Sequence, residues 1–182
     1  TLTIESLATK PRAWLLEKQF IPDYLLDAYT TTTDELIKHI EYKFELAGNV
    51  QQIRLHGDCH PSNILSTDDG MHIVDFGDAR RGPAVQDLWM LLSADRDYMT
   101  ARLADLLEGY TQFCEFNPAE LQLVEALRTL RIIHYAFWIA SRWDDPAFPR
   151  AFPWFNTTRY WEDHVLALRE QSALLGEPPL IW

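Results

Sequence analysis

Helical periodicity runs through most of this sequence, and one stretch, residues 52–75, breaks it. Apolar residues recur every three or four positions over residues 36–47 and again over 123–138, which is the spacing of one face of a helix. Two well-separated helical stretches with a single interruption favour a mainly α fold in which the interruption is a small inserted element.

The interruption itself has the pattern of a β-hairpin. Residues 52–55 read as a short strand, and residues 63–66 as a second extended run. The tetrapeptide at 67–70 combines threonine, two aspartates and glycine, which is typical of a turn, and residues 71–75 return as a strand. We therefore predict a mainly helical domain with one small polar hairpin in its middle.

Boundary residues predict where the helices begin and end. Thr33, followed by two acidic residues, predicts a helix start, and Gly48 predicts its end. Residues 117–120 combine an N-cap asparagine, a first-turn proline and a glutamate, as at a helix start. Three prolines within residues 144–154 predict a non-helical surface segment, before a last helix over 158–175.

Three oxygen-bearing side chains are placed where this hairpin brings strand ends together. Asp58 and Asn63 are five residues apart across a proline-containing loop, and Asp75 ends the return strand twelve residues after Asn63. Carboxylate and amide oxygens suit Mg²⁺, which usually takes one or two protein carboxylates beside substrate phosphates. A carboxylate outside the metal shell accepts a proton from an incoming hydroxyl group.

The amino-acid composition limits the kinds of partner that this protein is expected to bind and the cellular compartment in which it is expected. The 182 residues suit a single domain spanning 1–182, and 27 acidic against 16 basic residues give a net charge of −11, which disfavours nucleic-acid binding. Cys59 and Cys114 are too few for a disulfide framework, so a reducing, cytoplasmic location is expected. No apolar run reaches the roughly 20 residues of a membrane span, and no signal peptide is visible.

The residues around the predicted loop resemble known kinases. An Asp followed five residues later by Asn and then by an Asp-Phe-Gly triplet, here Asp75-Phe76-Gly77, is similar to the general kinase pattern. The HGDxHPxN form of residues 56–63 resembles the aminoglycoside phosphotransferase and choline kinase superfamily. The stretches GPAVQDLWMLL and DPAFP are closer to the bacterial stress response kinase A family, and this similarity covers nearly the whole chain.

The resemblance implies a protein-kinase-like C-terminal lobe, with a catalytic loop at 55–65 and a metal-binding segment at 73–79. It implies that Asp58 is the catalytic base and that Asn63 and Asp75 hold Mg²⁺ beside ATP. It also implies that His56 packs under the loop and that Asp87 braces the loop through hydrogen bonds.

The N-terminal lobe of such kinases is expected to be absent from this chain. Only 57 residues precede Asp58, and they contain no GxGxxG motif and one glycine besides Gly57. The chain also opens with Thr1 rather than methionine, so we expect that it is cut from a longer protein and that this lobe alone has little kinase activity.

Three functions remain open at this stage. The family resemblance favours a kinase that phosphorylates serine or threonine in proteins. A small-molecule kinase acting on an aminoglycoside, choline or homoserine-like alcohol would use the same residues, because every acceptor is an alcohol. A non-catalytic pseudokinase or binding module is the third possibility, against which all three chemical residues are present.

Several residues near the loop have two readings. Asp78 either touches the metal region or has a capping or solvated role, and His60 is expected to stabilise the loop by a hydrogen bond rather than to take part in the chemistry. Cys59 is expected to be a small buried side chain rather than a reactive thiol, and His134, in the apolar helix, a core histidine. The C-terminal aromatic residues are expected to pack as a core under the proline-rich segment, with a substrate-facing wall as the alternative: Trp138, Trp143, Phe148, Phe152, Trp154, Phe155, Tyr160 and Trp161.

Overall fold

The computed structural model describes residues 1–92 and 95–182, which form two compact units. The first unit comprises Thr1–Leu2, Lys43–Val124 and Pro178–Trp182, and the second comprises Thr3–Tyr42 and Glu125–Glu177. All residues of the predicted loop lie in the first unit. That residues 1–182 form one domain stays a prediction.

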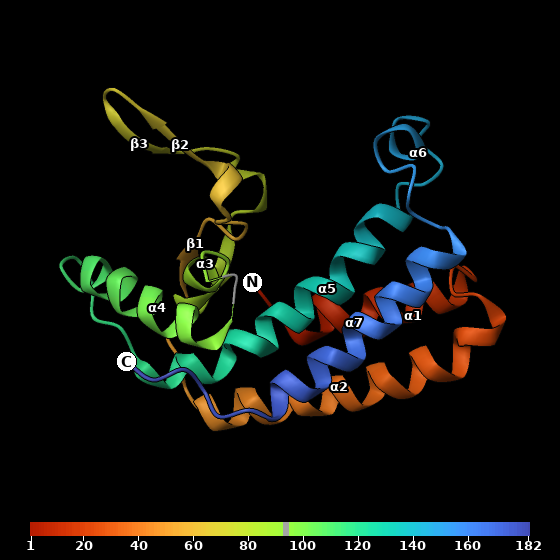
Figure 1. Cartoon of the computed structure of the whole chain (residues 1–182), viewed down its shortest axis with the longest axis horizontal. Helices are drawn as coiled ribbons and strands as arrows, with labels where there is room; N and C mark the ends of the chain where they lie inside the picture. The colour runs from red at the N-terminus through yellow and green to blue at the C-terminus, as the bar shows by residue number, and fades with distance from the viewer. Residues whose placement is uncertain (93–94) are drawn as a thin grey trace. The chain divides into compact units, whose positions relative to one another are not determined.

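The second unit is built from helices whose apolar faces meet. The helices α1, α2, α5 and α7 lie side by side (Figure 1). On α5, residues at spacings of three and four are almost completely buried, and burying each large apolar side chain contributes about 1.5–3 kcal/mol. The elements are η1 (Glu5–Thr9), α1 (Lys10–Glu17), η2 (Asp23–Leu25), α2 (Leu26–Ala47), α5 (Val124–Ala140), α6 (Ala147–Ala151) and α7 (Thr158–Gly176).

The first unit carries two small antiparallel sheets. Strand β1 pairs with β4, with Leu55 opposite Arg80, and β2 pairs with β3, with Ile64 opposite Ile73. The β2–β3 hairpin extends away from α3 and α4 (Figure 1). The elements are β1 (Ile53–Leu55), η3 (Pro61–Asn63), β2 (Ile64–Thr67), β3 (Gly70–Ile73), η4 (Phe76–Asp78), β4 (Arg80–Gly82), α3 (Val85–Trp89), α4 (Arg96–Tyr110) and η5 (Pro118–Leu123).

The predicted fold class is confirmed: the chain is mainly helical, with small antiparallel sheets, and the hairpin falls where its turn residues place it. The sequence pattern did not predict strand β4. Its three residues show no apolar alternation, and it is ordered by pairing with β1 and by the Leu2 N–H, which donates to the Arg81 carbonyl at 2.7 Å. Among residues 1–92 and 95–182, no helix has both the length and the hydropathy needed to cross a bilayer.

The prediction that α2 begins at Thr33 is wrong, because the helix begins at Leu26. The Thr33 hydroxyl lies inside the helix and donates to the Tyr29 carbonyl at 2.7 Å, while it accepts the Arg12 Nε–H at 2.7 Å. A threonine whose hydroxyl is satisfied in this way does not need to cap a helix end. The predicted end is confirmed, since Gly48 has a φ of 67° and its N–H donates to Phe44.

The prediction that residues 144–154 are non-helical is also wrong, because α6 occupies Ala147–Ala151. Pro149 is the third residue of this short helix. The first four N–H groups of a helix have no partner within it, so a proline there removes no hydrogen bond. Pro146 precedes the helix and is compatible with its start.

Two predicted helix starts are capped by side chains, and the Asn117 cap was predicted. The Asn117 side chain accepts the Ala119 N–H at 3.0 Å, although the segment that follows is the 3₁₀ helix η5, which leads directly into α5. The last helix spans Thr158–Gly176, within one residue of its predicted end, and the Thr157 hydroxyl accepts the Tyr160 N–H at 3.2 Å.

The C-terminal aromatic residues are divided between core and surface. Phe155 and Trp161 are buried, as core packing requires, whereas 46% of the Trp154 side chain is exposed. The Arg142 guanidinium lies 4.8 Å from the ring of Trp138, a cation–π distance. Core packing therefore describes only part of this set, and its role as a substrate wall stays a hypothesis.

A buried histidine lies between aromatic rings in the second unit. The ring of His164 is 6.1 Å from Tyr29 of α2 and 5.8 Å from Tyr160 and 5.6 Å from Trp161 of α7. Within the described chain, neither His164 Nε2 nor the Tyr29 hydroxyl has a hydrogen-bond partner. Burial lowers the pKa of His164 to about 4, because the charged imidazolium has lost its hydration.

Because His164 is buried, we predict that the stability of the folded chain decreases in acid. Because its pKa is about 4 in the folded chain and ~6.5 when unfolded, the unfolded state binds more protons between these values. Stability is therefore lost as pH falls from about 6.5 towards 4, and between pH 7 and pH 5 the loss should be about 2 kcal/mol. Urea unfolding at both pH values measures it.

His164→Phe should remove this part of the pH dependence. The matched control is His72→Phe, since His72 is exposed on the hairpin, and this variant should keep the wild-type pH dependence. An unchanged pH dependence in His164→Phe would show that the buried histidine does not cause the acid sensitivity.

Candidate active site

A single carboxylate holds the start of the loop that follows β1. Asp87, in the first turn of α3, accepts the His56 N–H at 2.6 Å through Oδ2 and the Gly57 N–H at 2.8 Å through Oδ1. Hydrogen bonds from backbone N–H groups to an ionised carboxylate are roughly twice as strong as neutral ones. The chain is therefore fixed immediately before Asp58.

Gly57 has no space for a side chain. Its φ is +89°, a conformation that other residues rarely adopt, and a Cβ added here would lie 2.2 Å from the Asp78 carbonyl oxygen. Its carbonyl accepts a hydrogen bond from Gln86 Nε2 at 3.3 Å. The loop, α3 and the end of η4 thus meet at one glycine.

His56 connects the loop to the segment that carries Asp75. Its ring is buried, and Nε2 lies 2.8 Å from the Val74 carbonyl, so Nε2 carries the proton and donates. Nδ1 then accepts the Asp58 N–H at 3.3 Å. The ring of Phe76 lies 4.9 Å from it. His56 therefore lies under the loop and holds its backbone.

Asn63 is tied to the same two segments. Its Nδ2 donates to the Asp58 carbonyl at 2.9 Å, and its own carbonyl accepts the Val74 N–H at 3.0 Å. Asp75 follows Val74 directly and has a left-handed backbone, with φ 64°, at the start of η4. Both backbone groups of Val74 thus hold the loop, and this places Asn63 and Asp75 on neighbouring, hydrogen-bonded segments.

The Asp58 side chain lies at the surface of the loop, with 21% of its area exposed, and His60 Nε2 is 3.4 Å from its Oδ2. This contact agrees with the expected loop-stabilising role of His60. Cys59 is buried, as predicted. Burial raises the pKa of the Cys59 thiol, and the carboxylates of Asp87 and Asp58 raise it further, so a reactive thiolate is disfavoured.

The donor set fits a magnesium ion. Asp75 is exposed and offers carboxylate oxygens, and Asn63 uses its NH₂ group internally, so its amide oxygen is the atom suited to a cation. Within residues 1–92 and 95–182, no cluster of three or more His, Cys, Asp or Glu side chains forms a metal cage. A site of two protein oxygens is what Mg²⁺ bound with phosphate oxygens needs. The catalytic and metal roles of these residues stay predictions.

Asp78 does not join the loop network through its side chain. Its carboxylate is exposed and pairs with the Arg80 guanidinium, and Arg80 Nε donates to the Asp78 carbonyl at 2.8 Å. The side chain is therefore already engaged by a cation, which favours a structural role over the metal-contacting one.

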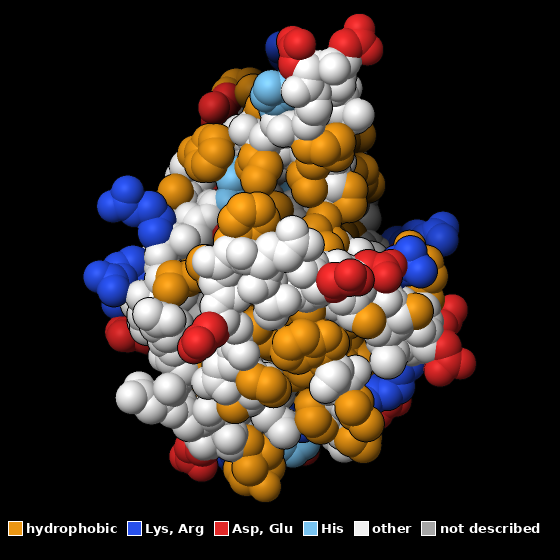
Figure 2. Space-filling view, turned by 90° about the vertical axis from the view of Figure 1, so that its left-hand side faces the viewer, with side chains coloured by type: hydrophobic (Ala, Val, Ile, Leu, Met, Phe, Trp, Pro, Cys, Tyr) orange, Lys and Arg blue, Asp and Glu red, His pale blue; other side chains and the backbone are white. Residues whose placement is uncertain are grey.

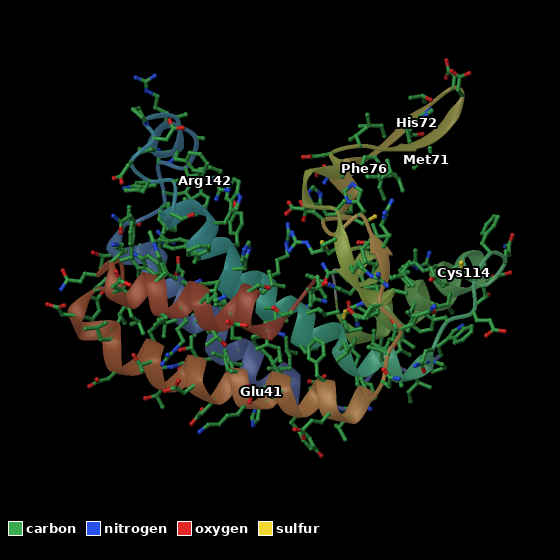
Figure 3. All side chains as sticks on the ribbon, turned by 180° about the vertical axis from the view of Figure 1, so that it is seen from behind. Glu41, Met71, His72, Phe76, Cys114 and Arg142 are labelled. Carbon is green, nitrogen blue, oxygen red and sulfur yellow. The ribbon has the colours of Figure 1, made fainter. Side chains whose placement is uncertain are left out.

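Hydrophobic side chains are exposed on the part of the first unit that carries the hairpin (Figure 2). Met71 and His72 are adjacent on β3, and Phe76 lies at the base of the hairpin (Figure 3). The exposed apolar residues here are Leu65, Met71, Ile73 and Phe76. The hairpin therefore presents an apolar surface beside the Asp58 loop.

The sequence patterns did not predict three residues that help to hold the Asp58 loop and α3 in place. Val74 acts only through backbone atoms, which no side-chain pattern reveals. Gln86 adjoins Asp87 in the same turn of α3, and its position beside the predicted bracing residue could have indicated its role. Glu120 accepts the Val85 N–H at 2.9 Å from 35 residues away, and no local pattern indicates it.

Comparison with known proteins identifies the family of this chain. Residues 5–124 match the model of the phosphotransferase enzyme family, and the chain belongs to that family. Its similarity to stress response kinase A of Escherichia coli (strain K12) is 42% identity over 180 residues, covering 99% of this chain and 54% of the relative.

Two further relatives have similar coverage. Stress response kinase A of Shigella flexneri is 41% identical over 180 residues, covering 99% of this chain and 54% of the relative. The serine/threonine protein kinase RdoA of Salmonella typhimurium is 40% identical over 171 residues, covering 94% of this chain and 51% of the relative. The chain thus spans about half the length of the curated relatives it matches.

Gly57→Ala should strain the loop. The added methyl group would meet the Asp78 carbonyl, and the positive φ is unfavourable for alanine, so we expect a loss of about 1–3 kcal/mol of stability. The amide exchange of His56 and Gly57 should also become faster, because their bonds to Asp87 must lengthen. Urea unfolding and amide hydrogen exchange measure the two effects.

Gly109→Ala is the matched control. Gly109 lies in α4, where a new Cβ would meet nothing within 4 Å, so alanine should be neutral or stabilise by about 0.5–1 kcal/mol. A Gly57 variant as stable as this control would show that the close approach to Asp78 is relaxed at no cost.

Proposed function

We propose that this chain is the catalytic-loop lobe of an ATP-dependent kinase that transfers the γ-phosphoryl group to a hydroxyl. The observation that carries the proposal is the hydrogen-bonded frame formed by Asp87, His56 and Val74, which holds Asp58 beside Asn63 and Asp75. Phosphoryl transfer depends mainly on positioning and charge stabilisation, and a frame of this kind supplies positioning.

Asp58 would act as the base. Its backbone is held on both sides, because its N–H donates to His56 and its carbonyl accepts from Asn63. Its carboxylate is partly exposed, so an acceptor hydroxyl has access to it. A carboxylate with a fixed backbone orients the hydroxyl and takes its proton as the phosphoryl group arrives.

Asn63 and Asp75 would hold Mg²⁺ through one amide oxygen and one carboxylate. The ion, when bound with ATP, neutralises charge that develops on the phosphate oxygens. Asn63 is buried and its Nδ2 donates to the Asp58 carbonyl, so its side chain is oriented in advance. Asp75 is exposed, as a group that faces an incoming nucleotide must be.

The other half of the nucleotide site is proposed to come from outside this chain. The sequence contains no Gly-rich phosphate loop, and the chain corresponds to about half of its kinase relatives. An N-terminal lobe bearing that loop and a phosphate-binding lysine would complete the site. On this proposal the chain alone has little activity. A reducing, cytoplasmic setting is part of the proposal and is supported by Cys59 and Cys114, both free thiols.

We favour serine or threonine of a protein as the acceptor. The support is that relatives 40–42% identical are named kinases, and one of them is named a serine/threonine protein kinase. A small alcohol is the second candidate, favoured by the match to a general phosphotransferase family. A non-catalytic module is disfavoured, because Asp58, Asn63 and Asp75 are all present and their segments are hydrogen-bonded together.

In the full-length protein, Asp58→Asn and Asp75→Asn should impair different steps, turnover in the first variant and Mg²⁺ binding in the second. Asp58→Asn should lower turnover by roughly 10²- to 10⁴-fold with nucleotide binding nearly intact, because only the base is lost. Asp75→Asn should raise the Mg²⁺ concentration needed at fixed ATP, because a charge leaves the metal shell. Single-turnover kinetics and Mg²⁺ titration measure these effects. Unchanged turnover in the first variant, or unchanged metal dependence in the second, would remove that residue from its role.

An acceptor panel tests the function itself. Full-length protein with radiolabelled ATP should label serine or threonine in protein substrates and should leave aminoglycosides, choline and homoserine unlabelled. Asp58→Asn serves as the control for contaminating kinases. Rapid labelling of a small alcohol with no labelled protein would assign the second candidate, and no transfer to any acceptor would support the non-catalytic module.

A further inference from the structure

The helix that braces the loop is itself held by a buried carboxylate. Glu120 of η5 has 3% of its surface exposed, and its Oε2 accepts the Val85 N–H at 2.9 Å. The neighbouring backbone of Ala84 also lowers the pKa of this carboxylate. The Val85 N–H lies at the start of α3 and has no partner within that helix. Glu120 therefore satisfies it.

The two residues that follow Val85 are the ones that touch the loop. Gln86 donates to the Gly57 carbonyl at 3.3 Å and accepts the Trp89 indole N–H at 3.3 Å. Asp87 accepts from His56 and Gly57. No residue separates the part of α3 that Glu120 holds from the part that holds the loop.

The helix is too short to resist a shift of its first turn. It spans five residues, Val85–Trp89, and its first turn is closed by 3₁₀-type bonds from Gln86 to Pro83 at 3.1 Å and from Asp87 to Ala84 at 3.2 Å. A long helix averages a local displacement over several turns of hydrogen bonds, whereas a single turn passes it on directly. Movement of Ala84 and Val85 therefore moves the Asp87 carboxylate.

The carboxylate that caps this short helix is buried. Burial raises the pKa of Glu120, and its interactions with the backbone of Val85 and Ala84 oppose that rise. Removal of the carboxylate leaves the Val85 N–H buried without an acceptor, which is more costly than loss of an exposed contact.

We propose that Glu120 is a positioning residue of the active site, which sets the place of Asp58 through α3 and Asp87. It touches neither nucleotide nor acceptor. The kinetic part of this inference rests on the proposed kinase function, whereas its structural part, control of the His56 and Gly57 amides by Glu120, does not.

The test uses Glu120→Ala and Glu120→Gln in the full-length protein, with Gln171→Ala as control. Gln171 is equally buried, at 3% exposure, and its side chain donates to Glu125 in the second unit. Glu120→Ala should lower kcat about tenfold with the KM for ATP nearly unchanged, because the base is displaced and the nucleotide site is not. Glu120→Gln keeps a neutral acceptor and should fall between Ala and wild type.

Amide exchange gives a second readout that needs no activity. Exchange at His56 and Gly57 should become about tenfold faster in Glu120→Ala and remain unchanged in Gln171→Ala. Combining Glu120→Ala with Asp87→Asn should lower kcat no further than Asp87→Asn alone, since both act through one contact.

The measurements distinguish the failure of the role proposed for Glu120 from the failure of the proposed kinase function. Unchanged exchange at His56 and Gly57 in a folded Glu120→Ala or Glu120→Gln variant overturns the role of Glu120, and so does an equal fall of kcat in Gln171→Ala. A wild-type protein that transfers no phosphoryl group overturns the proposed kinase function, and in that case the exchange rates still decide whether Glu120 positions the loop.

Discussion

The contact between the Asp87 carboxylate and the backbone of His56 and Gly57 is the interaction on which this site depends. One side chain on α3 satisfies two consecutive N–H groups, so the direction in which the chain leaves β1 is set by the position of a helix. The close approach of Gly57 to Asp78 leaves no space for a side chain at this point of the loop. The orientation of Asp58 is therefore a property of α3 as much as of the loop.

Val74 supplies the second anchor, and it does so through backbone atoms alone. Its carbonyl accepts from His56 and its N–H donates to Asn63, so the strand that leads into Asp75 is joined to both ends of the Asp58 loop. Backbone hydrogen bonds of this kind do not depend on the identity of the side chain. The chemical residues are thus connected through positions that sequence patterns cannot mark.

Local patterns predicted much of this fold, and tertiary contacts account for what they missed. The apolar stripe of α5, the hairpin turn and the end of α2 at Gly48 are encoded within a few residues of where they occur. The start of α2 was misplaced because Thr33 has capping chemistry, yet inside the helix its hydroxyl bonds to Tyr29. Strand β4 was invisible because only pairing with β1 makes it a strand.

The site residues also divide into those that local sequence patterns predict and those whose role depends on tertiary contacts. Asp58, Asn63 and Asp75 could be selected by spacing, and their segments are joined by hydrogen bonds. The role of Glu120 could not be read in this way, because its partner lies 35 residues away. Bonds between a sheltered carboxylate and backbone N–H groups are screened far less by salt than exposed pairs such as Lys10 and Glu5. In a chain with a net charge of −11, Asp87 and Glu120 therefore hold the loop by contacts that need no cation and change little with ionic strength.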